Sequence, residues 1–326
     1  MVNTIGNRKE WLDALRAVAI ILVVFGHCLQ SYDTFFIYTS PIKIPLFFAI
    51  TGFLINGQKS VKLFFKDWFF GIIIPYILLS LIPIIVLSPI SSPNVTEQNL
   101  KSILSGETYW FLPCLIIGNV IQFYQKKLFE RRLYLYVLSC ILLSGFGYFL
   151  AINHIGDYGC LNLALEVQIF YMLGALLRHF DQAIQDNVPK WMAILAVLVY
   201  VTMCLLSSYI YPKESLDVHE SYYYDLVVCL FTIIVGVTSL FVLFPKITTH
   251  SRMLVFIGQN TFVIYMWAGF VWTIFVSLLH LLGYEYPFNL LGDLIKSCII
   301  IACCCMAAAV LNKYVPVIVG NTKKKY

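Results

Sequence analysis

The chain has 326 residues, of which 60% are hydrophobic and 12% are charged, and its mean hydropathy is +0.83. Because a soluble globular domain carries roughly twice that charged fraction, the composition excludes a soluble protein and predicts an integral membrane protein without a large soluble domain. The net charge of +5 is explained by basic residues in short loops that set the topology, so we expect no nucleic-acid partner.

Apolar runs separated by polar or charged clusters predict ten membrane-spanning helices. Alternating ten-residue segments of the kind that build an outer-membrane barrel are absent from the sequence. We therefore expect an all-α polytopic bundle in which residues 1–326 form one integral-membrane domain, with the lipid bilayer as its partner. The predicted helices are 11–30, 40–56, 63–87, 109–124, 132–152, 159–178, 191–210, 222–244, 254–280 and 289–312.

The distribution of basic residues predicts the orientation in the membrane. With ten spans, 17 of the 22 Lys and Arg residues fall on one side, three fall on the other and two lie inside helices. Cytoplasmic loops hold the excess of Lys and Arg, so both termini are expected in the cytoplasm. The apolar run that follows Arg8 and Lys9 lacks a small-residue cleavage site before Tyr32, and we expect it to be an uncleaved first helix. A cell membrane, in the first place a bacterial cytoplasmic membrane, is the expected location.

The ten cysteines predict neither a disulfide framework nor a metal site. All but Cys160 lie inside apolar runs, where cysteine behaves as a small buried hydrophobe. The histidines are scattered, and no Cys/His spacing is typical of a metal site. We expect no metal.

The first helix carries the densest set of ionisable residues. Asp13, Arg16, His27 and Gln30 fall on one helical face, and the eleven residues from Arg16 to His27 correspond to a rise of about 16 Å. The alternative is that Asp13 and Arg16 form an ordinary ion pair and that His27 is a packing residue. Ionisable groups inside a membrane are costly, and histidine is the usual general base near neutral pH, so we favour a functional site.

Five segments of the chain resemble the membrane acyltransferase family 3, which includes O-acetyltransferases of surface polysaccharides. The first helix has the arginine, ten residues and histidine of that family, and a Pro-Leu-Phe-Phe-x-x-Thr-Gly element follows in the second helix. The similar segments are Arg8–His27, Ile44–Phe53, Tyr109–Pro113, Phe170–Gly174 and Ile257–Tyr265. The sequence departs from the family pattern at four positions: Lys62 and Lys66 stand where arginines are common after the second helix, Thr51 replaces serine, and Trp267 replaces a histidine.

The resemblance implies transfer of an acyl group, usually acetyl from acetyl-CoA, to a hydroxyl of a cell-surface glycan or its lipid-linked precursor. Acyl-CoA and a glycan acceptor are thus the expected small-molecule partners. The donor is cytoplasmic and its phosphates need cations, for which we expect Arg16, Lys62, Lys66 and Arg178. Each of these cations has an alternative role as a topology charge.

His27 is the expected catalytic residue, either as the general base on the acceptor hydroxyl or as a carrier of the acyl group. Glu166 reaches about the same depth from the outer side and is expected to orient His27, with Asn162, one turn away, contacting the acceptor. The alternative for Glu166 is a structural hydrogen bond between helices. Asp13 is expected to hold Arg16, since about 20 Å separates it from His27 along the helix.

Aromatic residues at the outer boundary have two interpretations. Tyr109 and Trp110 fit an interfacial aromatic belt, and they also fit stacking against a sugar of the acceptor. A different function, a transporter or exporter of a glycan or small solute, would explain a polar stripe through a bundle, but two halves with matched broken helices are not evident in the sequence. The sequence does not predict the oligomeric state.

Overall fold

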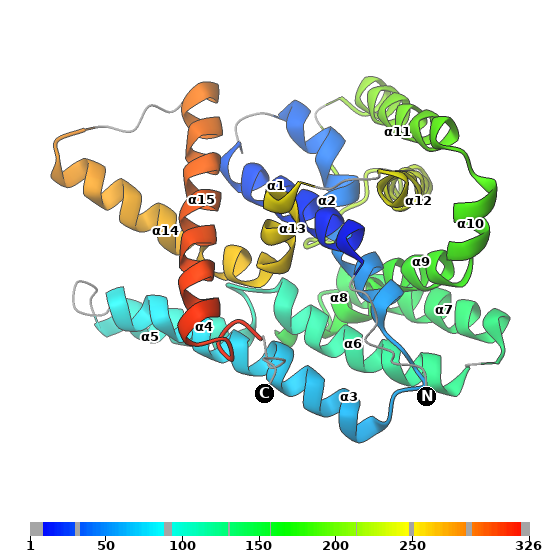
Figure 1. Cartoon of the computed structure of the whole chain (residues 1–326), viewed down its shortest axis with the longest axis horizontal. Helices are drawn as coiled ribbons and strands as arrows, with labels where there is room; N and C mark the ends of the chain where they lie inside the picture. Colours follow the sequence, from blue (N-terminus) through cyan, green and yellow to red (C-terminus); the bar gives the residue numbers. More distant parts are fainter. Residues whose placement is uncertain are drawn as a thin grey trace.

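The computed structural model describes residues 9–29, 33–87, 93–129, 131–156, 158–212, 214–247, 251–284 and 289–320, which form a bundle of helices (Figure 1). In chain order the elements are α1 (Glu10–Cys28), α2 (Asp33–Leu54), α3 (Val61–Trp68), the π-helical turn η1 (Phe69–Ile73), α4 (Ile74–Leu87), α5 (Pro93–Ser105), α6 (Phe111–Leu128), α7 (Leu133–Ile152), the 3-10 turn η2 (Tyr158–Cys160), α8 (Leu161–Glu166), α9 (Gln168–His179), α10 (Asp181–Asn187), α11 (Lys190–Ile210), α12 (Leu226–Leu243), the 3-10 turn η3 (Phe244–Lys246), α13 (Arg252–Gln259), α14 (Thr261–Leu281) and α15 (Leu290–Tyr314).

The fold class predicted from the sequence is confirmed: this is an all-α polytopic membrane bundle. Within the described residues, nine helical stretches are long and apolar enough to cross a membrane. The predicted span 109–124 corresponds to α6, which is not among the nine because it carries buried Asn119, Gln122 and Gln125 and has two lysines in its last turn. Polar side chains of this kind hold helices together in a membrane by hydrogen bonds.

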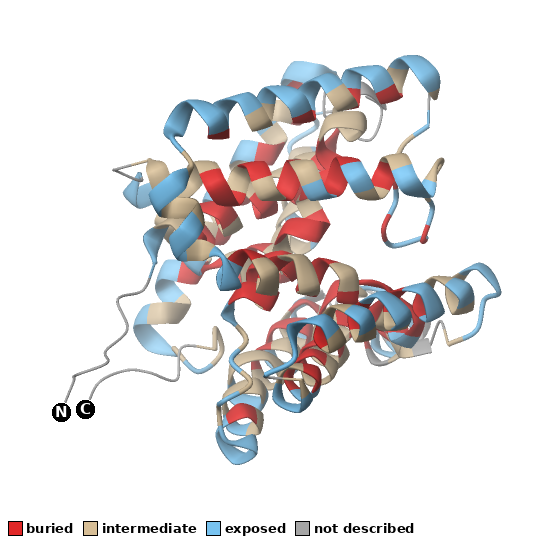
Figure 2. Ribbon diagram, turned by 90° about the vertical axis from the view of Figure 1, so that its right-hand side faces the viewer, coloured by how far each residue is buried: buried red, intermediate tan, exposed pale blue. Residues whose placement is uncertain are grey.

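Burial separates central helices from peripheral ones. Helices α1 and α2 bury 61% of their spanning windows, whereas the α3–α4 stretch and α14 bury only 17%. The peripheral helices expose leucine, isoleucine and valine side chains, such as Leu198 and Leu205 of α11, as lipid-facing surfaces do. Figure 2 shows the buried residues on the inward sides of the helices. The first helix, with its polar stripe, therefore lies inside the bundle.

A close crossing between two central helices explains why the Phe170–Gly174 segment contains glycine. Helix α9 crosses α2 at Gly174, where an added Cβ would lie 1.8 Å from the carbonyl oxygen of Ala49. A larger residue would push the two helices apart, because a backbone carbonyl cannot move aside as a side chain can. The glycine of the Phe170–Gly174 segment thus serves packing.

Helices α1 and α15 run in opposite directions beside each other. At one end, Asp13 accepts a hydrogen bond from Gln259, and the adjacent Asn260 accepts one from Asn312 near the end of α15. At the other end, Cys28 and Lys296 line one cavity. The start of α1 and the end of α15 therefore lie on the same side of the bundle, which is the arrangement that an even number of spans produces.

Several predicted elements differ from the structure in their bounds or their continuity. The helix expected at 40–56 begins at Asp33, and the helix expected at 159–178 is divided into α8 and α9. The expected outer loop 88–108 contains helix α5, whose Ile103 is buried and accepts a hydrogen bond from Tyr76 through its carbonyl oxygen at 2.7 Å. The expected helix 254–280 is broken at Asn260, whose side chain bonds both Phe256 and Asn312. The predicted helix 222–244 begins only at Leu226, because the side chain of Asp225 caps it.

Candidate active site

His27 lies in the last turn of α1 and lines a cavity of about 700 Å³. Its side chain is accessible, although Gly26 and Cys28 beside it are buried. Ile20, Val23 and Val24 precede it along the cavity wall at the three- and four-residue spacing of one helical face. His27 thus shares the cavity wall with buried residues of the same helical face, as the functional interpretation of the stripe requires.

The cavity extends from His27 toward the inner side of the bundle but ends short of Arg16. Its lowest lining residue on α1 is Ile20, which is four residues, or about 6 Å, above Arg16. Arg16 and His27 thus share a helix and a face, as predicted, but the structure does not join them in one cavity. Gln30, the remaining member of the predicted stripe, lies outside the described residues.

Tyr109 and Trp110 line the same cavity as His27, so the structure brings these predicted residues together. The hydroxyl of Tyr109 donates a hydrogen bond to the carbonyl oxygen of Met266 at 3.2 Å, which ties the start of α6 to α14. Tyr265, in the last of the family-like segments, also lines the cavity. Aromatic rings thus form much of the wall opposite α1.

Lys296 of α15 is a residue of this cavity that the sequence interpretation did not assign to the site. Its Nζ atom lies 3.9 Å from the ring centroid of Trp272, a cation–π contact between two lining residues. The sequence signal was present, because a lysine inside a span is costly. Its spacing of three residues from Asp293 is, however, also that of an ordinary ion pair within one helix, which is a purely structural interpretation.

Two further charged residues act on His27 from other elements. The fields of Lys43 in α2 and of Asp217 in the α11–α12 connection reach its imidazole. Lys43 lies over the ring of Phe36, with 4.7 Å between Nζ and the ring centroid. Neither residue was predicted: Lys43 counted only as an outer topology charge, and Asp217 stands in a loop with no motif. Only the folded arrangement places them near His27.

Glu166 has partners other than His27. Its carboxylate accepts hydrogen bonds from the hydroxyls of Ser221 and Tyr223, each at 2.5 Å, and the side chain is buried. Burial and the neighbouring Glu166 carboxylate raise the pKa of Tyr223 well above its usual value, so that phenol remains a donor. The structure therefore favours the alternative interpretation, a structural link from α8 to the connection before α12.

Asn162 lines a second cavity, of about 440 Å³, together with Trp110. Its side-chain oxygen accepts a hydrogen bond from the backbone of Leu163 at 2.7 Å. Trp110 lines both cavities, so Asn162 and His27 lie in neighbouring compartments that share one aromatic wall.

At the inner end of α1, Asp13 holds Arg16 as predicted. Asp13 is buried, and its two carboxylate oxygens accept hydrogen bonds from Arg16 and from Gln259 of α13, both at 3.2 Å. Helix α13 approaches so closely that a Cβ on Gly258 would lie 1.7 Å from the carbonyl oxygen of Asp13. The Ile257-Gly-Gln segment thus supplies both the close approach and the second donor to Asp13.

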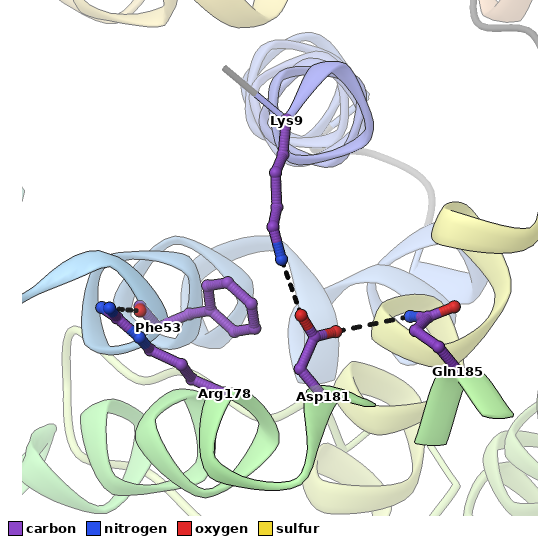
Figure 3. Close-up of polar contacts among 5 residues, drawn as sticks. All are labelled: Lys9, Phe53, Arg178, Asp181 and Gln185. Carbon is purple, nitrogen blue, oxygen red and sulfur yellow. Dashed lines mark hydrogen bonds and ion pairs between the residues drawn. The ribbon is translucent and has the colours of Figure 1, made fainter. Parts of the chain in front are cut away.

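Arg178, predicted to bind the donor, is hydrogen-bonded to the carboxyl end of α2. Its Nη1 atom donates to the carbonyl oxygens of Phe53 at 3.1 Å and Leu54 at 3.3 Å, as Figure 3 shows for Phe53. Lys126 donates to the carbonyls of Gly52 and Ile55 at 2.5 and 3.0 Å. Two cations therefore donate hydrogen bonds to the carbonyl groups at the C-terminal end of α2, which have no partner within the helix and carry its partial negative charge.

The other predicted donor-binding cations, Lys62 and Lys66, do not join Arg178. Lys62 and Lys66 are exposed on α3, and neither lines either cavity. Lys9, just before α1, pairs with Asp181 at 2.6 Å and lies over the ring of Phe53 (Figure 3). Among the described residues, no group of three or more His, Cys, Asp or Glu side chains is placed to hold a metal ion.

Comparisons with known proteins agree with the resemblance seen in the sequence. A family model described as an acyltransferase domain matches residues 9–310. The chain is also similar to an amino-acid racemase of Enterococcus faecalis, at 26% identity over 263 residues, which cover 68% of this chain and 35% of that protein. The chain thus spans about a third of the length of this curated relative. No solved structure matches it. Because the family model covers nearly the whole chain, including α1 and the walls of the His27 cavity, the protein belongs to the acyltransferase family 3.

Proposed function

We propose that the protein transfers an acyl group, in the first place acetyl, from acyl-CoA to a hydroxyl of a cell-surface glycan or its lipid-linked precursor at the cell membrane. The observation that carries this proposal is the position of His27: an accessible imidazole on the wall of a cavity of about 700 Å³, inside a bundle that belongs to an acyltransferase family. A histidine so placed meets the requirement for base catalysis, since the reacting hydroxyl can reach it inside the cavity.

The chemistry requires one proton transfer and one exchange of bonds at the acyl carbon. His27 removes the proton of the acceptor hydroxyl as the oxygen attacks the thioester carbonyl. The carbon–sulfur bond then breaks, the ester forms, and the CoA thiolate leaves and takes up the proton. In the alternative, a nitrogen of His27 itself takes the acyl group from CoA and passes it to the hydroxyl. Both routes give the same products.

Lys296 supplies positive charge to this reaction. The carbonyl oxygen becomes negative as the hydroxyl attacks, and a cation fixed nearby stabilises that charge. Lys296 lines the same cavity as His27, and its contact with Trp272 fixes its position. We infer that Lys296 serves the developing oxyanion.

The donor enters from the cytoplasmic side in this proposal. Arg16 is bonded to Asp13, and its side chain is 28% exposed, so part of the guanidinium remains accessible beside the lower end of the cavity. Arginine binds phosphate with a planar fork of donors, and Arg16 is therefore the residue we propose for the cofactor's phosphates. Lys62 and Lys66, exposed on α3, are further candidates. Arg178 is the weakest candidate because its guanidinium already bonds the end of α2.

The test uses purified protein in liposomes, labelled acetyl-CoA and glycan extracted from the source cells' envelope. Incorporation of label into the glycan, with one CoA released for each acetyl transferred, supports the proposal. Movement of unmodified glycan or solute across the liposome membrane without CoA release would instead support the transporter alternative. Release of CoA with the label on an acceptor other than a glycan would retain the acyltransferase and reject the glycan.

A further inference from the structure

The second cavity, of about 440 Å³, is formed by four segments of the chain that lie at helix ends or between helices. It is bounded by the α5–α6 connection, the end of α7, the start of α8 and the connection between α11 and α12. By the distribution of basic residues, all of these segments face the outside of the membrane. We infer that this cavity binds the carbohydrate chain of the acceptor while the hydroxyl to be acylated reaches past Trp110 to His27. This inference rests on the proposed function.

The backbone around this cavity is unusually strained. Three residues other than glycine have left-handed backbone conformations within the described chain: His154, Cys160 and Ser221, with φ of 54°, 59° and 52°. All three line the second cavity: His154 and Cys160 come from the segment between α7 and α8, and Ser221 comes from the α11–α12 connection. Such conformations are unfavourable for residues with a Cβ and cluster at functional sites. The presence of all three conformations around one cavity is a second observation, separate from the volume of the cavity, that indicates a functional site.

Trp110 connects the two cavities. Its ring stacks on the imidazole of His219, with 4.6 Å between ring centroids and 27° between planes, and Trp110 lines both compartments. An aromatic face of this kind offers a flat apolar surface, on which the apolar face of a sugar ring can lie. A sugar held against this wall would place its neighbour in the chain near the His27 cavity.

The polar groups of the second cavity define the class of ligand. Glu107, Glu220, His154, His219 and Asn162 line it, while none of its described lining residues is Lys or Arg. The imidazole of His219 is paired with Glu220 at 2.9 Å. Two glutamates, in a lining whose described residues include no Lys or Arg, disfavour an anionic ligand and suit one that offers hydroxyl or amino donors. The ligand class is therefore a neutral or amino-bearing oligosaccharide.

The first experiment measures transfer from acetyl-CoA to envelope glycan taken from source cells that lack the gene. The variants are Glu107→Gln, which removes a charge, and His154→Asn, which removes the ring but keeps a residue that tolerates a left-handed backbone. Each should raise the KM for the glycan about tenfold while kcat and the KM for acetyl-CoA change less than twofold. Glu97→Gln, at an exposed residue of α5, is the matched control and should change none of these values.

A second experiment tests the ligand class by competition with hexamers of chitin, chitosan and galacturonate. The neutral or the cationic hexamer should inhibit glycan acylation at a concentration at least tenfold lower than the anionic one. Equal or better inhibition by the anionic hexamer, or inhibition by none of the three, would overturn the assignment.

The experiments distinguish failure of the second-cavity subsite from failure of the proposed function. Transfer to glycan with an unchanged acceptor KM in both cavity variants would remove the subsite and leave the proposed function intact. Absence of glycan acylation by the unaltered protein would remove both.

Discussion

The outer and inner ends of α1 carry the same kinds of residue but are built for different tasks. At the outer end, His27 and Lys296 line an open cavity with aromatic walls. At the inner end, Asp13 is saturated by Arg16 and Gln259, and Arg178 bonds the end of α2. A charged residue near a membrane boundary therefore indicates a binding site only if its hydrogen-bonding capacity is not already used by the helices around it.

The largest effect is expected at the outer end, from His27→Ala. General acid–base catalysis contributes about 10²- to 10⁴-fold, and loss of the imidazole should reduce acetyl transfer by that amount. The matched control is His280→Ala, which removes an exposed histidine at the end of α14. Transfer is measured as CoA release and label incorporation, with monodispersity checked by size-exclusion chromatography. Full activity of a monodisperse His27→Ala protein would remove the catalytic assignment.

The next effect concerns Glu166 and is expected on stability. Glu166→Ala leaves the hydroxyls of Ser221 and Tyr223 without their buried acceptor, which should lower the free energy of unfolding by about 3 kcal/mol, and Glu166→Gln should lose less. The control is Glu214→Ala, which breaks an exposed hydrogen bond from Tyr222. Thermal unfolding in detergent measures both. An unchanged Tm with a shifted pH profile of kcat would instead restore the predicted pairing with His27.

The third prediction asks whether Arg16 binds the donor in addition to bonding Asp13. Arg16→Lys keeps a cation but removes the planar fork, so the KM for acetyl-CoA should rise about tenfold, corresponding to about 1.4 kcal/mol. Asp13→Asn separates the two roles, because it loosens Arg16 without removing the fork. If Arg16→Lys lowered Tm and left the KM for acetyl-CoA unchanged, Arg16 would be structural, like Arg178.

The fourth prediction concerns Arg178, at the same side of the bundle as Arg16, where we expect an effect on stability and not on donor binding. Loss of its hydrogen bonds to the end of α2 should cost about 1 kcal/mol of unfolding free energy, with little change in the KM for acetyl-CoA. Arg131→Ala, an exposed arginine before α7, serves as the control for charge alone. A rise in the KM for acetyl-CoA confined to Arg178→Ala would return Arg178 to the donor site.

Most of the helices were predictable because hydropathy reports directly on burial in lipid. Each of the ten predicted spans corresponds to one helix or to consecutive helices, yet the polar helix α5 and the break at Asn260 were missed. Both depend on tertiary hydrogen bonds, from Tyr76 to Ile103 and from Asn312 to Asn260, that no local pattern encodes. Local periodicity thus predicts the spans better than the elements between them.

The sequence predicts the site best where a single helix carries its residues. The spacing on α1 placed His27 correctly on an inward face, and the pairing of Asp13 with Arg16 follows from three-residue spacing. The approach of Lys43, Asp217 and Lys296 to His27 or its cavity depends on how separate elements fold together. Glu166 was assigned to His27 for the same reason: the sequence indicates its depth in the membrane but not its partners, Ser221 and Tyr223, which come from another part of the chain.

The smallest effect is a pH dependence at the outer side, where Asp225 caps α12. Its carboxylate accepts hydrogen bonds from the backbone N–H of Val228 at 2.9 Å and from the hydroxyl of Tyr211 at 3.1 Å, and these bonds lower the pKa of Asp225. Because the folded pKa lies below the unfolded value of about 3.9, this stabilisation is fully present above that value and is lost as the pH falls through the folded pKa. Asp225→Asn keeps a capping oxygen without the charge, so Tm should depend less on pH below about 4 than in the unaltered protein. Asp186→Asn in α10 is the control; an acid-side slope that is the same in Asp225→Asn and in the unaltered protein would show that this cap contributes nothing to it.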